Sequence, residues 1–250
     1  MIVEIMNEWK NIWNKDSNIM SLSHKYDNLE CQDFLKEEAI LNSLITTSGF
    51  ASELGNFCST NWLNYTDYLF KKIDIKEKDS IFEVGCGTGA FIYPLYLRGH
   101  KVGGADYSYH SIKIAKSIFC SKNFICEEAM NILSKIKFDV VLSHSVFQYF
   151  PNLDYAEKVI INMINKSNNK VAFLDINDAS KEDIYHEIRM GKMDHENYKK
   201  KYDGLNHTFY RKDWFQRLAS KMDLYIEIFD QNFETYVNST LRFNVVMIKK

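Results

Sequence analysis

The chain contains 250 residues, of which 46% are hydrophobic and 26% are charged. This composition is typical of a globular protein with a sizeable core, and it excludes a disordered chain. Basic residues number 31 and acidic residues 33, so the formal net charge is -2. Proteins that bind nucleic acid or membrane surfaces usually carry an excess of Lys and Arg, so neither partner is expected.

The cysteines and the hydropathy pattern narrow the class of protein and its expected location in the cell. The chain has five cysteines, an odd number, and no C-x-x-C spacing, which favours reduced thiols over disulfides or a zinc site. We therefore expect a cytoplasmic protein without a bound metal. Glu4 interrupts the only apolar stretch near the beginning of the chain, which argues against a secretory signal, and no apolar run approaches the length of a membrane span.

Residues 1–72 are expected to be helical. Trp9 and Trp13 share one helical face, and large apolar residues recur at helical spacing over residues 61–72. We interpret this region as an N-terminal helical extension that forms a lid over the main domain, residues 73–250.

From residue 80 onward, strand and helix patterns alternate. Such alternation predicts a parallel sheet with helices on both faces and right-handed crossover connections. The expected strands are residues 80–84, 101–105, 123–126, 138–143 and 170–176, and the expected helices are residues 88–98, 108–119 and 155–165.

Residues 177–210 interrupt this alternation. They are polar, with several Tyr, His and Lys residues, and are expected to form an irregular insertion, which in a compact domain is usually functional. A helix is expected at 211–220, followed by strand-like runs at 224–229 and 241–248. The short connection between these two runs predicts an antiparallel pair at the end of the sheet.

The strongest motif is E-V-G-C-G-T-G at residues 83–89, where an apolar strand runs into a glycine-rich turn and then into the expected helix. Glycine lets a ligand approach the main chain closely, and a helix N-terminus offers free N–H groups. In an open parallel sheet, ligands bind outside the carboxyl ends of the strands. The motif therefore predicts a small-molecule site in a nucleotide-binding fold.

Glu83 indicates which nucleotide binds there. Gly85, Gly87 and Ala90 also fit the dinucleotide fingerprint G-x-G-x-x-G/A, which by itself would suit a nicotinamide cofactor. A carboxylate two residues before the first glycine, however, would repel a pyrophosphate and attract a positive group through a charge-assisted hydrogen bond. S-adenosylmethionine carries an ammonium and a sulfonium group, so Glu83 favours it. The alternative is that Glu83 is only a solvated charge at the end of a strand.

The second motif is G-G-A-D-Y-S at residues 103–108. Asp106 ends the next expected strand, about twenty residues beyond the first glycine, where an acidic side chain reaches ribose hydroxyls. We expect Asp106 to bind the ribose and Tyr107 to stack beside the adenine. Asp106 could also cap the helix that begins near Ser108, and the two roles are compatible.

These residues resemble the class I S-adenosylmethionine-dependent methyltransferases over residues 80–176. The resemblance implies a Rossmann-like, mostly parallel seven-stranded sheet with an antiparallel last strand pair, and a cofactor lying across the first strands. It also implies an adenine-binding motif at residues 128–130. The residues expected to bind S-adenosylmethionine are Glu83, Gly85, Cys86, Gly87, Thr88, Gly89, Asp106, Tyr107, Ser108, Glu128, Ala129, Met130 and Ser143.

Methyl transfer from a sulfonium is an in-line displacement that mainly requires alignment and the exclusion of water. A base is needed only when the acceptor is an alcohol, a phenol or a protonated amine. His144, which follows the fourth strand, is the first candidate base, and His207 in the insertion is the second. His144 could instead only hydrogen-bond the cofactor or the backbone, and His207 could be a surface residue.

The acceptor site is expected near the ends of the fourth and fifth strands. In many small-molecule members of the family, the turn after the fourth strand ends in a Glu-His pair, and this chain has Gln148 and Tyr149 there. The residues expected to line the acceptor site are Tyr149, Asp175, Tyr210 and Arg211. Asp175 could instead cap a helix, and packing in the core or on the surface is the alternative for the other three.

The sequence therefore favours an S-adenosylmethionine-dependent methyltransferase that modifies an O, N or C atom of a small molecule. One alternative is a protein or RNA methyltransferase, for which the dense basic runs 71–72 and 199–201 give little support. The others are an NAD(P)-dependent reductase and a methyltransferase-like binding protein without catalysis.

Overall fold

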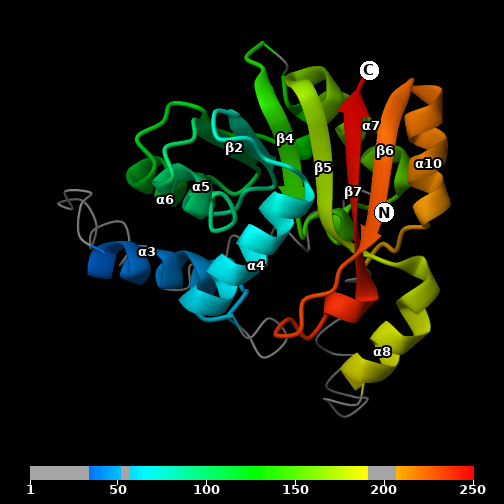
Figure 1. Ribbon diagram of the computed structural model, residues 1–250, viewed down its shortest axis with the longest axis horizontal. Helices are drawn as coiled ribbons and strands as arrows, with labels where there is room; N and C mark the ends of the chain where they lie inside the picture. Colours follow the sequence, from blue (N-terminus) through cyan, green and yellow to red (C-terminus); the bar gives the residue numbers. More distant parts are fainter. Residues whose placement is uncertain (1–33, 52–56, 134, 191–206) are drawn as a thin grey trace.

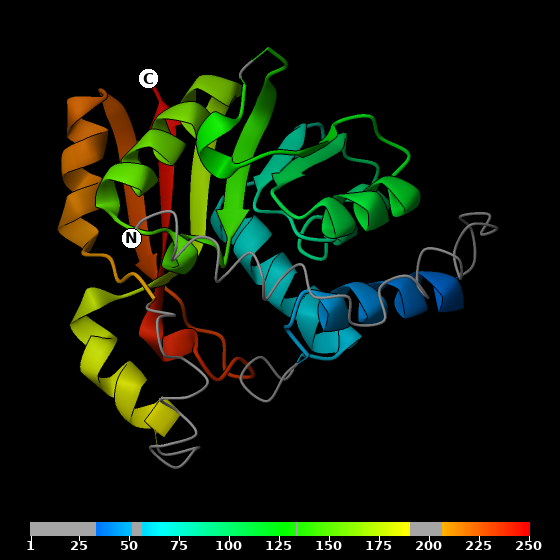
Figure 2. The same ribbon diagram turned by 180° about the vertical axis from the view of Figure 1, so that it is seen from behind.

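The computed structural model describes residues 34–51, 57–133, 135–190 and 207–250. A seven-stranded sheet lies at the centre, and helices cover both of its faces (Figures 1 and 2). The strands are β1 (Ile81–Val84), β2 (Val102–Asp106), β3 (Phe124–Cys126), β4 (Phe138–His144), β5 (Ser167–Asn177), β6 (Leu224–Asp230) and β7 (Arg242–Lys249). The α-helices are α3 (Phe34–Thr47), α4 (Ser59–Lys72), α5 (Tyr93–Leu97), α6 (Tyr109–Ile118), α7 (Leu153–Lys166), α8 (Glu182–Met190) and α10 (Lys212–Lys221).

The strands follow the order β3-β2-β1-β4-β5-β7-β6 across the sheet. The pairs from β3 to β5 are parallel, whereas β7 is antiparallel to both β5 and β6. The predicted Rossmann-like sheet and its antiparallel last pair are thereby confirmed. The order reverses between β2-β1 and β4-β5, so the ends of β1 and β4 form the edge where such folds bind ligands.

Each face of the sheet is covered by its own apolar core. Trp62 of α4 belongs to the core on one face, and Val159 of α7 belongs to the core on the other. Figures 1 and 2 show α4 and α7 on opposite sides of the sheet. Successive side chains of β5 point to opposite faces of the sheet. Phe173 therefore belongs to the core that contains α7, and Leu174 belongs to the core that contains α4. Burial on both faces explains why the central stretches of the parallel strands β4 and β5 are apolar.

Two expected elements differ from the structure. The helix predicted at 88–98 is limited to α5, because Gly89 has φ +92° and interrupts the helical conformation, and Pro94 lies at the helix start. The insertion is partly regular, since α8 occupies its first half. Its remainder, residues 191–206, and the helices expected over residues 1–33 lie outside the described residues.

Among the described residues, no helix is long and apolar enough to cross a membrane. The same part of the chain contains no group of three or more His, Cys, Asp or Glu residues arranged to hold a metal ion. The described cysteines, Cys58, Cys86, Cys120 and Cys126, are free thiols.

Candidate functional site

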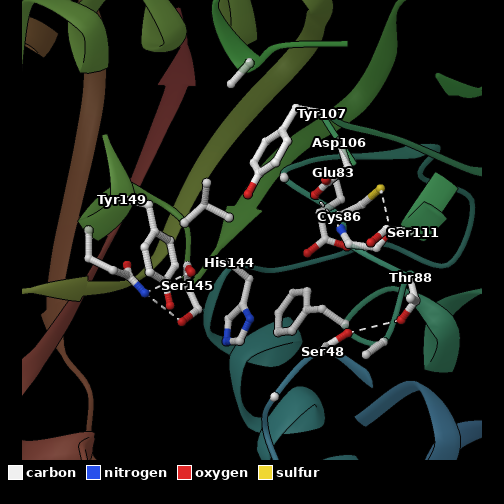
Figure 3. Close-up of a pocket in the computed structure, with 18 of the residues that line it drawn as sticks. Ser48, Glu83, Cys86, Thr88, Asp106, Tyr107, Ser111, His144, Ser145 and Tyr149 are labelled. Carbon is white, nitrogen blue, oxygen red and sulfur yellow. Dashed lines mark hydrogen bonds between the residues drawn. The ribbon is translucent and has the colours of Figure 1, made fainter. Parts of the chain in front are cut away.

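A cavity of about 260 Å³ lies at the carboxyl ends of β1, β2 and β4. Figure 3 shows Glu83 and Asp106 grouped on one side of it and Ser145 and Tyr149 on the other, with Tyr107 between them. The first side is called the acidic half below and is built on the glycine turn. The second is called the aromatic half and is built on the segment after β4, with residues of α8 and β7 behind it.

Asp106 holds the glycine turn against the end of β2. Its Oδ2 accepts a hydrogen bond from the N–H of Gly87 at 2.9 Å, and its Oδ1 accepts one from the N–H of Ser108 at 2.8 Å. Burial raises the pKa of Asp106, and these two backbone donors partly offset that rise. The carboxylate therefore fixes the shape of the turn and also lines the cavity, where its remaining lone pairs can accept hydroxyl donors.

Glu83 is the unsatisfied carboxylate of the acidic half. Its side chain is 2% exposed and lines the cavity, and its Oε2 has no hydrogen-bond partner among the described residues. Burial, and then the charge of Asp106, raise the pKa of Glu83 well above its usual value. A buried carboxylate without a partner is costly, so this position fits a ligand that brings a cation or a hydrogen-bond donor.

The end of α3 closes the acidic half from above the turn. The hydroxyls of Thr47 and Ser48 lie 3.3 and 3.1 Å from Oγ1 of Thr88, and the contact from Ser48 is drawn in Figure 3. Thr47 and Ser48 both line the cavity. The region before the main domain therefore contributes polar groups to the site.

His144 is held rigidly at the border between the two halves. Its ring stacks on Phe91, with centroids 4.1 Å apart and an interplanar angle of 8°, and its Nε2 lies 2.9 Å from the hydroxyl of Tyr65. Burial lowers the pKa of His144 to about 4. The imidazole is therefore neutral at pH 7, where it contacts the hydroxyl of Tyr65 and lines the cavity.

We predict that His144 remains neutral down to about pH 5, where an ordinary histidine is already charged. Since its folded pKa lies below its unfolded value, the unfolded chain binds the proton more tightly. The contribution to stability is therefore complete above about pH 6.5 and falls as the pH approaches 4, by about 3 kcal/mol at most. An NMR titration of the His144 ring and urea unfolding at several pH values measure both effects. A ring titration midpoint near 6.5 would contradict this prediction, and His144→Phe should remove the pH dependence.

His207 lines the aromatic half. Its Nδ1 lies 2.6 Å from the hydroxyl of Tyr185 on α8, and its ring meets that of Tyr149 edge-on at 5.3 Å. The insertion at residues 177–210 therefore places the imidazole of His207 at the cavity. Tyr149 itself also lines this half.

Most of the predicted site residues come together at the cavity. Those that line it are Glu83, Gly85, Cys86, Gly87, Thr88, Asp106, Tyr107, Glu128, Ala129, His144, Tyr149 and His207. Those that do not are Gly89, Ser108, Met130, Ser143, Asp175, Tyr210 and Arg211.

Several of the predicted residues that do not line the cavity stabilise the fold beside it. Ser108 caps α6 by accepting from the N–H of Ser111, and the hydroxyl of Ser143 donates to the carbonyl of Val84 at 2.8 Å. A side chain on Gly89 would collide with the ring of Phe119, so this glycine serves packing. Met130 lies in a short helical turn beside the site and is partly exposed.

Three substrate-contact predictions need correction. Tyr210 is fully buried and donates to the carbonyl of Phe147 at 2.8 Å, so it belongs to the core. Arg211 is exposed and pairs with Asp213. Asp175 is completely buried behind the cavity wall and does not line the cavity.

Sequence reasoning missed several lining residues. They are Thr47, Ser48, Ser111, Gln148, Tyr236, Asn238 and Arg242. Arg242 carries the clearest signal that was available, because it is a charged residue at the start of a mostly apolar final strand. Thr47 and Ser48 carry none, because they belong to a separate helix far upstream of the motif.

Comparisons with known proteins identify the family. A family model described as "Methyltransferase domain" matches residues 75–216. Malonyl-[acyl-carrier protein] O-methyltransferase 1 from Ilyobacter polytropus is 26% identical over 184 residues, which cover 68% of this chain and 67% of that protein.

Solved structures share the fold at low sequence identity. Magnesium protoporphyrin IX methyltransferase from Synechocystis, with bound S-adenosylmethionine, is 11% identical with a TM-score of 0.57, covering 89% of this chain and all of that one. The plantazolicin methyltransferase, in complex with a substrate analogue and S-adenosylhomocysteine, is 17% identical with a TM-score of 0.56, covering 100% of this chain and 98% of that one. With the family match, this fold and the E-x-G-x-G-x-G turn, the chain belongs to the methyltransferase domain family and is an S-adenosylmethionine-dependent methyltransferase.

Proposed function

We propose that this methyltransferase binds its cofactor in the acidic half of the cavity and methylates a small molecule held in the aromatic half. The observation that carries the proposal is the buried carboxylate of Glu83, whose Oε2 has no hydrogen-bond partner among the described residues, beside Asp106 at the glycine turn. S-adenosylmethionine, when bound, supplies an activated methyl group. It also supplies positively charged groups that can serve as the missing partner of this carboxylate. Asp106 would accept from the ribose hydroxyls, and Tyr107 and Ala129 would border the adenine.

A small acceptor is supported by the lining of the aromatic half. His144, Tyr149, His207 and Tyr236 surround it, and these side chains present flat apolar surfaces with polar tips. The Ilyobacter relative is named for an acyl-carrier-protein substrate, so a small acyl group attached to a carrier is included in this proposal. The net charge of -2 gives a nucleic-acid substrate no electrostatic support.

Neither imidazole is proposed as a strong base. The pKa of His144, lowered to about 4 by burial, makes it a weak proton acceptor. His207 is held through Nδ1 by the hydroxyl of Tyr185. We propose that both rings contact the acceptor and orient it, and that the chemistry relies on alignment and on the exclusion of water.

The division into an N-terminal lid, residues 1–72, and a main domain also stands as a proposal. It is supported by Thr47, Ser48 and Phe50, which reach the cavity from outside the main domain. A cytoplasmic location is supported by the free thiols of the described cysteines.

Isothermal titration with S-adenosylhomocysteine and with NAD⁺ or NADP⁺ tests the proposed site. We expect the first to bind and the nicotinamide nucleotides to fail to bind. Mass spectrometry of a metabolite extract incubated with the protein and S-adenosylmethionine should then show products heavier by one methylene unit. Preferential binding of a nicotinamide nucleotide would overturn the proposal, and cofactor binding without any methylated product would favour a non-catalytic binding protein.

Glu83→Gln should lower the affinity for S-adenosylmethionine about tenfold, because a charge-assisted hydrogen bond becomes a neutral one. In the wild type, affinity should fall as the pH drops through the raised pKa of Glu83, since the protonated side chain no longer attracts a cation. The variant should lack this pH dependence in calorimetric titrations.

Glu127→Gln is the matched control. Glu127 also lines the cavity, but its Oε1 already accepts from the N–H of Glu128 and from Asn131. Its substitution should leave both the affinity and its pH dependence nearly unchanged. Equal losses in the two variants would show that the effect comes from the total negative charge of the cavity and would contradict the role of Glu83.

A further inference from the structure

Arg242 is a buried cation in the wall of the aromatic half. It is the first residue of β7, is 5% exposed and lines the cavity. Its Nε and Nη1 are buried and have no hydrogen-bond partner among the described residues. Burying a guanidinium while leaving donors unused costs free energy, so the arrangement is favourable only if an acceptor completes it.

Asp175 balances the charge of Arg242 but does not use its donors. The nearest contact between them, from Nε to Oδ1, is 3.7 Å, which is too long for a hydrogen bond. Asp175 instead accepts from Nε2 of Gln231 and from the hydroxyl of Tyr236, each at 3.0 Å. The carboxylate of Asp175 is thus already satisfied by neutral donors, and Nη1 of Arg242 is left for another partner.

Ionisation of the pair is maintained inside the fold. Burial opposes the charge on Arg242, but Asp175 more than offsets this effect and the pKa of Arg242 is raised. Burial likewise raises the pKa of Asp175, yet Arg242 and the hydrogen bonds to the carboxylate bring it below its ordinary value. Asp175 is also held at φ +60°, where the register of β5 against β7 shifts. Strained residues at such shifts typically serve a site by aiming a side chain.

No other charge in the aromatic half competes with Arg242. The acidic residues that line the cavity within the described part of the chain are Glu83, Asp106, Glu127 and Glu128, and all belong to the acidic half. His144 is neutral because burial lowers its pKa to about 4. The ring of Tyr185 lies 5.8 Å from the guanidinium carbon and supports the cation from one side. The aromatic half therefore presents one cation to whatever enters it.

We infer that the acceptor carries a carboxylate and that Arg242 binds it. The inference rests on the proposed function, since it names the substrate class of the same cavity. Arginine suits a planar carboxylate because its donors form a rigid fork. Only five of the 31 basic residues are Arg, so the use of Arg at this buried position in a Lys-rich chain fits that geometric need. Asp175 already balances much of the charge of Arg242, so the free donors suit a singly charged carboxylate better than a phosphate dianion.

The test compares isosteric probes on protein saturated with S-adenosylhomocysteine. Benzoate and benzamide form one pair, hexanoate and hexanamide a second, and inorganic phosphate is a separate probe. Calorimetry should show at least tenfold tighter binding of each carboxylate than of its amide. Arg242→Gln should abolish this preference, and Arg242→Lys should retain only part of it. Absence of the preference in the wild type, or tighter binding of phosphate than of the carboxylates, overturns the inference.

A paired variant separates recognition from folding. Arg242→Gln alone leaves the Asp175 charge buried without its counter-ion, which is strongly destabilising, whereas Arg242→Gln with Asp175→Asn removes both charges together. Both variants should bind S-adenosylhomocysteine within twofold of the wild type, because Arg242 lies outside the acidic half. Retained carboxylate preference in the paired variant also overturns the inference. Failure of the wild type to bind S-adenosylhomocysteine would instead contradict the proposed function.

Discussion

Replacing Asp106 by alanine should lower the affinity for S-adenosylhomocysteine about 100-fold. The carboxylate holds the N–H groups of Gly87 and Ser108, and we propose that it also accepts from the ribose. Hydrogen bonds to a charged group contribute about 1.5–3 kcal/mol each. Losing the ribose contacts and loosening the turn together should therefore cost about 3 kcal/mol of binding free energy. Isothermal titration measures the loss directly.

Two further variants serve as comparisons for the affinity loss of Asp106→Ala. Asp106→Asn keeps one acceptor without the charge, so its loss should be about tenfold. Asp154→Ala removes an exposed carboxylate in the first turn of α7 that does not line the cavity, and it should leave affinity unchanged. Thermal unfolding without ligand shows whether the folded population is affected. If Asp106→Ala bound the ligand as tightly as the wild type, the cofactor could not lie against the end of β2.

Gly85→Ala should destabilise the protein by about 3 kcal/mol and abolish cofactor binding. Gly85 has φ +75°, a conformation that costs an L-residue about 1–2 kcal/mol. An added Cβ would also lie 2.5 and 2.8 Å from the two methyl groups of Val146, an overpacking cost of about 1–3 kcal/mol. Urea unfolding measures the first effect, and titration with S-adenosylhomocysteine measures the second.

The chain offers a matched control for the clash. Gly99 also has a positive φ, +86°, but a Cβ there would meet nothing within 4 Å. Gly99→Ala should therefore show the backbone cost alone, about 1 kcal/mol, with normal cofactor binding. Adding Val146→Ala to Gly85→Ala should recover part of the lost stability. Equal destabilisation in the two single variants would mean that Val146 moves aside without cost.

The acidic half could be predicted because its signals are local. Glu83, the glycine turn and Asp106 lie within two short motifs, each placed by an apolar strand directly before it. Strand alternation fixes where such a turn lies relative to the sheet, so residue type and spacing together indicate the chemistry. The length of α5 was mispredicted because the glycines that shape the turn also prevent the helix from starting there.

Only part of the aromatic half could be predicted, because Tyr149 and His207 line it but its other wall is assembled from distant segments. Arg242, Tyr236 and Asp175 meet only after β7 inserts antiparallel beside β5. Tyr210 was expected either to line the acceptor site or to pack in the core, and the structure places it in the core, where its backbone bridges to Asp178. Pairing register decides which face a side chain occupies, and no local pattern reveals that register.

The four carboxylates that line the acidic half also bear on turnover. They are Glu83, Asp106, Glu127 and Glu128, and Glu83 is the one whose Oε2 is buried without a hydrogen-bond partner in the described part of the chain. The donor enters with a positive sulfur, which becomes an uncharged thioether once the methyl group has left. The electrostatic attraction of Glu83 for the donor is therefore greatest before the reaction and weaker after it. The carboxylate that attracts the fresh donor thus also favours replacement of the spent one.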